Sequence, residues 1–146
     1  MDDEALDGLS IHVVLRLPRD PRTIAFVRDF ARDALALVAA RDEAVKDISV
    51  ALSEACANAV EHATGAVEYE VTLDVNADRF TALVTDQGQG LTEEMVTKSM
   101  PDPSESRGRG LPLMRALSDE ATFTVQPGIG TTVQLITLLN SGGSEY

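Results

Sequence analysis

Hydrophobic and polar residues alternate along several stretches of this chain. The clearest stretch is Val67 to Val75, where Val, Tyr, Val, Leu and Val alternate with Glu, Glu, Thr and Asp. A period of two predicts a strand with one buried face. Asn76-Ala77-Asp78 then predicts a hairpin turn into a second strand. The same reasoning predicts further strands at residues 11–17, 79–85, 121–126 and 131–139.

Three other stretches carry apolar residues at helical spacing. The first helix is expected from Pro21 to about Ala40, with Asp20 as its N-cap. A second helix follows the break at Arg41-Asp42, and a short apolar helix follows Gly110. Clean alternation in the strands favours a sheet with one solvated face, so the helices are expected on the other face. The predicted fold class is α/β (α+β), a two-layer sandwich with a mixed, mostly antiparallel sheet.

Length and charge limit what this fold can do. The 146 residues suit one domain, expected over residues 10–139, with flexible tails at 1–9 and 140–146. Twenty-four acidic against 12 basic residues give a net charge of -12, which disfavours direct binding of nucleic acid or of an anionic membrane. No apolar run is long enough to span a bilayer, and the acidic N-terminus is unlike a signal peptide. With the single Cys56 on an apolar stripe, these features predict a cytoplasmic protein.

The second predicted helix carries the first candidate for chemistry. Glu54 and Asn58 are four residues apart, so their side chains lie one turn apart on the same side of the helix. Alanines surround them, which would let a bulky ligand approach closely. A carboxylate and an amide carbonyl at this spacing suit a base and a metal ligand. A solvated helix edge is the alternative interpretation.

A glycine-bearing loop follows the strand at 79–85. In Asp86-Gln87-Gly88-Gln89-Gly90 an acidic residue ends a strand, and two glycines allow backbone to lie close to a ligand. A carboxylate only accepts hydrogen bonds, so it suits an exocyclic amino group such as that of adenine. A tight turn capped by Asp has the same letters. The long segment at 91–107 that follows is typical of a lid or of a disordered segment.

A second glycine-bearing segment opens the short helix. Arg107-Gly108-Arg109-Gly110 precedes Leu111 and, with Arg115, forms a locally basic patch on an acidic chain. Glycines that lead into a helix N-terminus are typical of an anion site. A flexible loop with solubilising arginines is the alternative interpretation. The phosphate-binding loop of P-loop NTPases and the third glycine of a dinucleotide motif are both absent. The two histidines do not combine with Cys56 at zinc-ligand spacing.

Taken in order, these motifs resemble those of the Bergerat-fold ATPases, the superfamily of gyrase and sensor histidine kinases. The shared elements are Glu54-x-x-x-Asn58, Asp86-x-Gly88-x-Gly90, Gly108-x-Gly110 and Gly130-Thr131, within roughly Ile11 to Leu139. The small size and the runs SEACANAVEHA and GRGLPLMRALSDE are most similar to the anti-sigma factor serine/threonine kinases of bacteria.

The resemblance implies a role for each matching position. Asn58 would coordinate Mg²⁺ that bridges the phosphates of ATP, and Glu54 would be the general base for a protein hydroxyl. Asp86 would bind the adenine amino group. The remaining residues expected to bind the cofactor are Gly88, Gly90, Arg107, Gly108, Arg109, Gly110, Leu111, Thr131 and Thr132.

The resemblance also implies partners. The protein would hold a sigma factor inactive, phosphorylate an anti-anti-sigma protein and form a homodimer. One alternative is a regulatory module that binds nucleotide and a partner without transferring phosphate. A second alternative, a detached catalytic domain of a sensor histidine kinase, is weaker because neither histidine lies on an obvious dimerisation helix.

Overall fold

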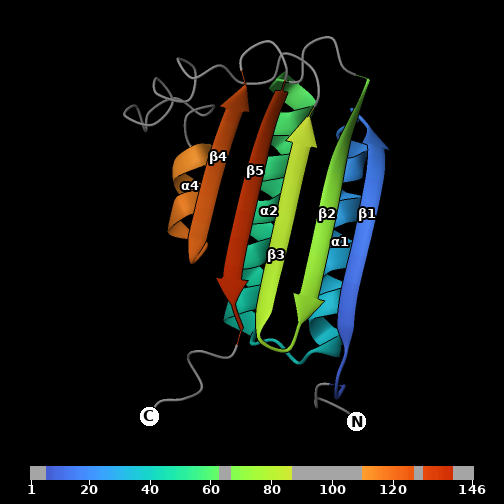
Figure 1. Ribbon diagram of the computed structural model, residues 1–146, viewed down its shortest axis with the longest axis vertical. Helices are drawn as coiled ribbons and strands as arrows, with labels where there is room; N and C mark the ends of the chain where they lie inside the picture. Colours follow the sequence, from blue (N-terminus) through green and yellow to red (C-terminus); the bar gives the residue numbers. More distant parts are fainter. Residues whose placement is uncertain (1–5, 63–66, 87–109, 127–129, 140–146) are drawn as a thin grey trace.

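The computed structural model describes residues 6–62, 67–86, 110–126 and 130–139. In this part of the chain five strands form one sheet in the spatial order β1-β2-β3-β5-β4 (Figure 1). The strands are β1 (Ser10–Pro18), β2 (Glu68–Asn76), β3 (Arg79–Asp86), β4 (Glu120–Gln126) and β5 (Gly130–Leu138). All four neighbouring pairs are antiparallel, so the expected strands are confirmed and the expectation of a mixed sheet is wrong for the described pairs. The reason is that β5 lies between β3 and β4 and runs opposite to both.

The helices cover one face of the sheet, as expected. They are α1 (Arg22–Leu37), α2 (Asp42–His62) and α4 (Gly110–Ala116). The first contacts β1 and β2, the second contacts β3 and β5, and α4 packs against α2 and β4 (Figure 1). Among the described residues, no helix combines the length and the apolar character that a membrane crossing requires.

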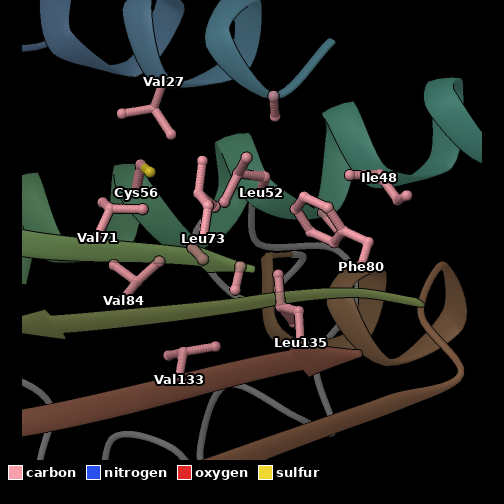
Figure 2. Packing of buried hydrophobic residues seen from close by; sticks show 14 of the residues in the cluster. Val27, Ile48, Leu52, Cys56, Val71, Leu73, Phe80, Val84, Val133 and Leu135 are labelled. Atoms are coloured by element: carbon pink, nitrogen blue, oxygen red, sulfur yellow. The ribbon is translucent and has the colours of Figure 1, made fainter. Parts of the chain in front are cut away.

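The core lies between this helical layer and the inward face of the sheet. Figure 2 shows α2 contributing Ile48, Leu52 and Cys56 toward Leu73 and Val84, which belong to the sheet. Along β2 and β3 every second residue is buried, which is the pattern that the alternation predicted. The apolar stripe expected on α2 is therefore the inward face of that helix.

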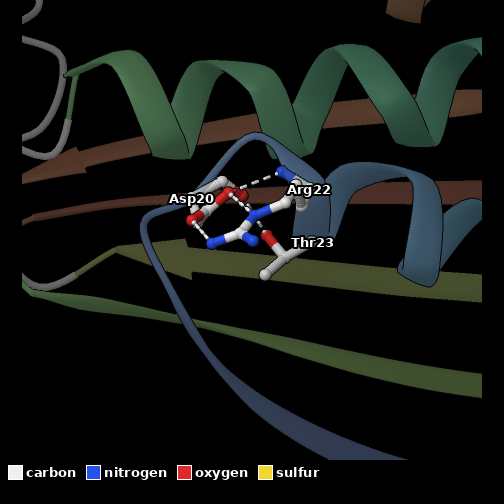
Figure 3. A network of polar contacts seen from close by, with 3 residues as sticks. All are labelled: Asp20, Arg22 and Thr23. Carbon is white, nitrogen blue, oxygen red and sulfur yellow. Dashed lines mark hydrogen bonds and ion pairs between the residues drawn. The ribbon is translucent and has the colours of Figure 1, made fainter.

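A braced turn starts α1. The carboxylate of Asp20 accepts hydrogen bonds from the backbone N–H of Arg22 at 2.8 Å and from its guanidinium at 3.0 and 2.7 Å (Figure 3). These bonds lower the pKa of Asp20 to about 2. Asp20 thus bonds an N–H of the first turn as a cap does, although Pro21 is the N-cap residue and the helix begins one residue later than expected.

The end of α1 differs from the prediction. The helix ends at Leu37 rather than near Ala40, because Ala39 adopts a left-handed backbone with φ of 54°. Its N–H donates to the carbonyl of Ala36, and the N–H of Ala40 donates to the carbonyl of Leu35, both at 3.1 Å. This is the bonding pattern of a Schellman C-cap, which usually has glycine at the left-handed position.

The sequence predicts a flexible tail over residues 1–9, and the structure describes residues 6–9 of it. The N–H of Leu6 donates to the carbonyl of Leu37 at 3.1 Å, and Leu9 packs against the core. The contacts of the fold therefore reach at least Leu6. Residues 1–5 and 140–146 lie outside the described residues.

Candidate functional site

The C-terminal half of α2 carries Glu54 and Asn58, both partly buried, beside the fully buried Ala55 and Ala59. The Nδ2 atom of Asn58 is buried and has no hydrogen-bond partner in the part of the chain that the structure describes. Leaving such a group unsatisfied costs about 1–3 kcal/mol. The helix therefore keeps a polar group at a position where the described fold makes no use of it, which is typical of a ligand site.

A buried carboxylate faces this helix from the sheet. Asp86 is the last residue of β3 and is 5% exposed. The strand register pairs it with Tyr69 of β2 on one side and with Thr131 of β5 on the other. Thr131 is buried as well, at 4% exposure. Asp86 and Thr131 are thus two buried polar side chains on neighbouring strands, at one end of the inward face of the sheet.

Helix and sheet enclose a small cavity at this end of the fold. Its polar lining consists of Asn58, Asp86 and Thr131, and its apolar lining consists of Ala55, Ala59, Val84 and Val133. Figure 1 shows why these residues meet: α2 ends, β3 ends and β5 begins at the same end of the sandwich. An acceptor carboxylate, an amide and a hydroxyl converge there, on walls kept apart by small side chains.

Thr132 does not join this cavity. Its Oγ1 atom lies 3.4 Å from Oγ1 of Thr85, on the face of the sheet that the helices leave uncovered. Successive residues of a strand point to opposite faces, so Thr131 and Thr132 cannot both line one cavity with their side chains. Of the two threonines expected to bind the cofactor, the structure brings only Thr131 to Asn58 and Asp86.

The glycine-bearing segments are described only at one end. Gly110 begins α4, and the side chain of Leu111 is buried in the core at 2% exposure. Only the backbone of Leu111 is therefore free to contact a ligand. Gly88, Gly90, Arg107, Gly108 and Arg109 lie outside the described residues, as does the expected lid.

Arg115 was expected in the basic patch next to these glycines. Its guanidinium lies over the ring of Phe123, 4.9 Å from the ring centroid. This cation–π contact joins the last turn of α4 to β4. The structure thus gives Arg115 a contact within the fold.

Residues 17–137 match the model of the histidine kinase-like ATPase domain, which is most of the chain. This protein belongs to that family.

Relatives and solved structures agree with this membership. The chain is 29% identical to a serine-protein kinase RsbW from Bacillus velezensis, over 88% of this chain and 86% of the relative. It is 32% identical to an anti-sigma F factor from Pasteuria penetrans, over 77% of this chain and 83% of the relative. A crystal structure of the RsbU and RsbW domains of a Mycobacterium tuberculosis protein superposes with a TM-score of 0.66 at 26% identity. That match covers 88% of this chain and 32% of the other, so the present chain spans about a third of it.

In this ATPase domain Glu54 lies one turn before Asn58 but does not line the cavity. Burial raises the pKa of the Glu54 carboxyl above its ordinary value, and the carboxylate of Glu61 two turns along the helix raises it further. A carboxylate with a raised pKa binds a proton more readily, which is what a general base requires.

Two sets of contacts beside the site were not found from the sequence. Arg19 reaches the C-terminal end of α2, and Thr23 reaches the hydroxyl of Tyr69. Cys56 is the buried residue that the sequence predicted, and burial raises its pKa to about 12. An arginine after a strand and a tyrosine within one carry no local signal of such partners, because these contacts join residues 41 and 46 positions apart.

Proposed function

We propose that this chain is an ATP-dependent serine-protein kinase that also acts as an anti-sigma factor. The observation that carries the proposal is the cavity that unites Asn58, Asp86 and Thr131. It occurs in a chain whose relatives are named serine-protein kinase RsbW and anti-sigma F factor along most of their length. The proposed ATPase domain spans residues 10–139 and acts in the cytoplasm.

The adenine of ATP binds where Asp86 and Thr131 lie. The buried Asp86 carboxylate accepts a hydrogen bond from the exocyclic amino group, and a buried acceptor discriminates against purines that lack this donor. Thr131 beside it supplies a hydroxyl. Gly88 and Gly90 follow Asp86 in the sequence and shape the same pocket with their backbone.

The donor set fits a magnesium ion shared with the nucleotide. In the described residues no three His, Cys, Asp or Glu side chains are grouped to hold a metal. Mg²⁺ in nucleotide enzymes takes few protein oxygens and completes its shell with phosphates and water. Asn58, whose buried Nδ2 lacks a partner among the described residues, would offer its amide oxygen. When bound, the ion neutralises phosphate charge that an acidic chain repels.

The transferred phosphate goes to a serine. Glu54 accepts the proton of the serine hydroxyl as the serine oxygen forms its bond to the γ-phosphorus, and the bond from that phosphorus to the β-phosphate oxygen breaks. ADP and phosphoserine are the products. Arg107, Gly108, Arg109 and Gly110, with the backbone of Leu111, bind the phosphates during this step.

The protein partners follow from the same proposal. A sigma factor is held inactive by this chain, an anti-anti-sigma protein receives the phosphate, and the kinase works as a homodimer. Size-exclusion chromatography with light scattering measures the dimer, and co-purification with the sigma factor of the same organism measures the complex.

Phosphotransfer is the direct test. The purified chain is incubated with γ-labelled ATP, Mg²⁺ and the candidate anti-anti-sigma protein, beside Glu54→Gln. Labelled phosphoserine with the wild type and at least a hundredfold slower labelling with Glu54→Gln is the expected result. Equal rates would remove Glu54 from its role. ATP binding without any labelled protein would identify a nucleotide-dependent binding module instead.

A further inference from the structure

The turn between β1 and α1 holds the end of the helix that carries Asn58. The guanidinium of Arg19 donates from Nε and Nη2 to the backbone carbonyl of Val60, at 3.0 and 2.5 Å. The backbone N–H of Arg19 donates to the carbonyl of Val67 at 3.1 Å. One residue thus ties the last turn of α2 to the start of β2.

Within the described residues, the carbonyl of Val60 is one that α2 itself leaves open. The last four carbonyls of an α-helix have no intrahelical partner, and they form the negative end of its dipole. A cation that donates two hydrogen bonds there satisfies the carbonyl and fixes the direction of the last turn. The contact is partly buried, so solvent screens it less than a surface pair. Asn58 lies two residues before Val60 and moves with this turn.

The same turn of chain also reaches the sheet wall of the cavity. The hydroxyl of Thr23 donates to the carbonyl of Asp20 at 2.7 Å and lies 2.6 Å from the hydroxyl of Tyr69. Because Thr23 has a single hydroxyl proton, Tyr69 is the donor in the second bond. Tyr69 is 2% exposed and is the register partner of Asp86. Figure 3 shows Thr23 next to the Asp20–Arg22 bonds that brace the turn.

We infer that Arg19 and Thr23 are positioning residues for the nucleotide site, which hold the helix wall and the sheet wall of the cavity at a fixed separation. Arg19 acts through Val60 on Asn58, and Thr23 acts through Tyr69 on Asp86. Neither residue lines the cavity. The inference rests on the proposed function, because the ligand whose affinity it controls is ATP.

The test compares Arg19→Ala with Arg16→Ala. Arg16 is three residues earlier, and its side chain is 76% exposed on the uncovered face, where it pairs with Glu70. In nucleotide-free protein, hydrogen exchange of residues 57–62 should be faster in Arg19→Ala and unchanged in Arg16→Ala. By calorimetric titration the Kd for Mg-ATP should rise about tenfold in Arg19→Ala, because the two charge-assisted hydrogen bonds that hold the helix wall are lost. Arg19→Lys keeps the charge and a donor, so it should recover most of the affinity.

Thr23→Val is the second arm, with Thr72→Val on the uncovered face of β2 as its control. We expect weaker ATP binding for Thr23→Val alone. In Arg19→Ala and in Thr23→Val the phosphotransfer rate at saturating ATP should stay near that of the wild type. The reacting groups are intact in both variants, and only the separation of the cavity walls in the nucleotide-free protein is altered.

The outcomes separate this inference from the proposed function. Wild-type protein that fails to bind Mg-ATP refutes the proposed function, and the role of Arg19 falls with it. Wild-type binding together with unchanged affinity in Arg19→Ala refutes the inference alone. Equal losses in Arg19→Ala and Arg16→Ala would also overturn it, since a general loss of stability would then explain both.

Discussion

Replacing Asp86 by Asn changes one atom of a buried side chain. Asn has nearly the same shape, so the core around it is kept, but one acceptor oxygen becomes an NH₂ donor. At 5% exposure the new amide has little access to water. If adenine binds here, its exocyclic amino group would face the NH₂ donor of the new amide or its single carbonyl oxygen. In the wild type it faces a carboxylate, in which both oxygens are acceptors.

The size of the effect follows from this burial. Losing a hydrogen bond to a charged group and leaving a donor unsatisfied costs about 2.4 kcal/mol, within the usual range of about 1–3. That corresponds to a Kd for ATP about 60-fold higher. At an ATP concentration about 100 times the wild-type Kd, ligand adds about 2.7 kcal/mol to the wild type and about 0.6 kcal/mol to the variant. For 146 residues the unfolding entropy is about 0.3 kcal/mol/K, so the melting temperature should rise by about 9 °C and about 2 °C respectively.

Thermal melts with and without Mg-ATP measure this difference. Each variant is compared with itself, so any change in its intrinsic stability cancels. If Mg-ATP raised the melting temperature of Asp86→Asn as much as that of the wild type, the proposal that Asp86 binds the adenine would be refuted. No rise in the wild type at millimolar Mg-ATP would remove the nucleotide site altogether.

Four further predictions concern single residues of the same protein. Thr131→Val should reduce the rise in melting temperature with Mg-ATP, while Thr132→Val should keep it, because only Thr131 lines the cavity; equal effects would contradict that geometry. Ala39→Gly should raise the unfolding free energy in urea by about 0.5–1 kcal/mol, since relief of the left-handed strain exceeds the entropy that glycine adds to the unfolded chain, and a loss of stability would oppose this reading of the C-cap. Phosphotransfer should increase with pH through the raised pKa of Glu54. Between the ordinary glutamate pKa and that raised value, the folded protein holds a proton that the unfolded chain has released, so the Glu54 contribution to stability should fall as pH rises. Urea unfolding at several pH values should show this fall in the wild type and its absence in Glu54→Gln.

The strands could be predicted because their signal is local. A strand of period two shows its buried face in any five consecutive residues, and β2 and β3 follow that pattern throughout. The end of α1 could not be predicted from the sequence. Ala39 is a strong helix former, and it stands at the left-handed position of the C-cap, which is usually a glycine. There the hydrogen bonds of the cap override the preference of the residue.

The candidate site was predictable to the same degree. Asn58 and Asp86 belong to short motifs, and the structure brings both to one cavity. The sequence could not show which of Thr131 and Thr132 faces the cavity, because β5 has apolar residues at both odd and even positions. Val133 and Leu135 point inward, whereas Ile136 and Leu138 point outward, and only the pairing with β3 reveals which set is buried.

The direction of Asn58 is set by the packing of α2 and not by a loop. A helix rotates as a rigid unit, so the contacts of Ile48, Leu52 and Cys56 with the sheet fix the angle at which every other side chain of α2 projects (Figure 2). Ala55 and Ala59 flank Asn58 and are buried, so the core extends up to the site without filling it. The buried polar side chains Asp86 and Thr131 lie at the end where β3 stops and β5 begins, and a buried polar atom there can be satisfied by a ligand that enters from outside. The apolar stripe therefore positions the site residues in the same step in which it builds the core.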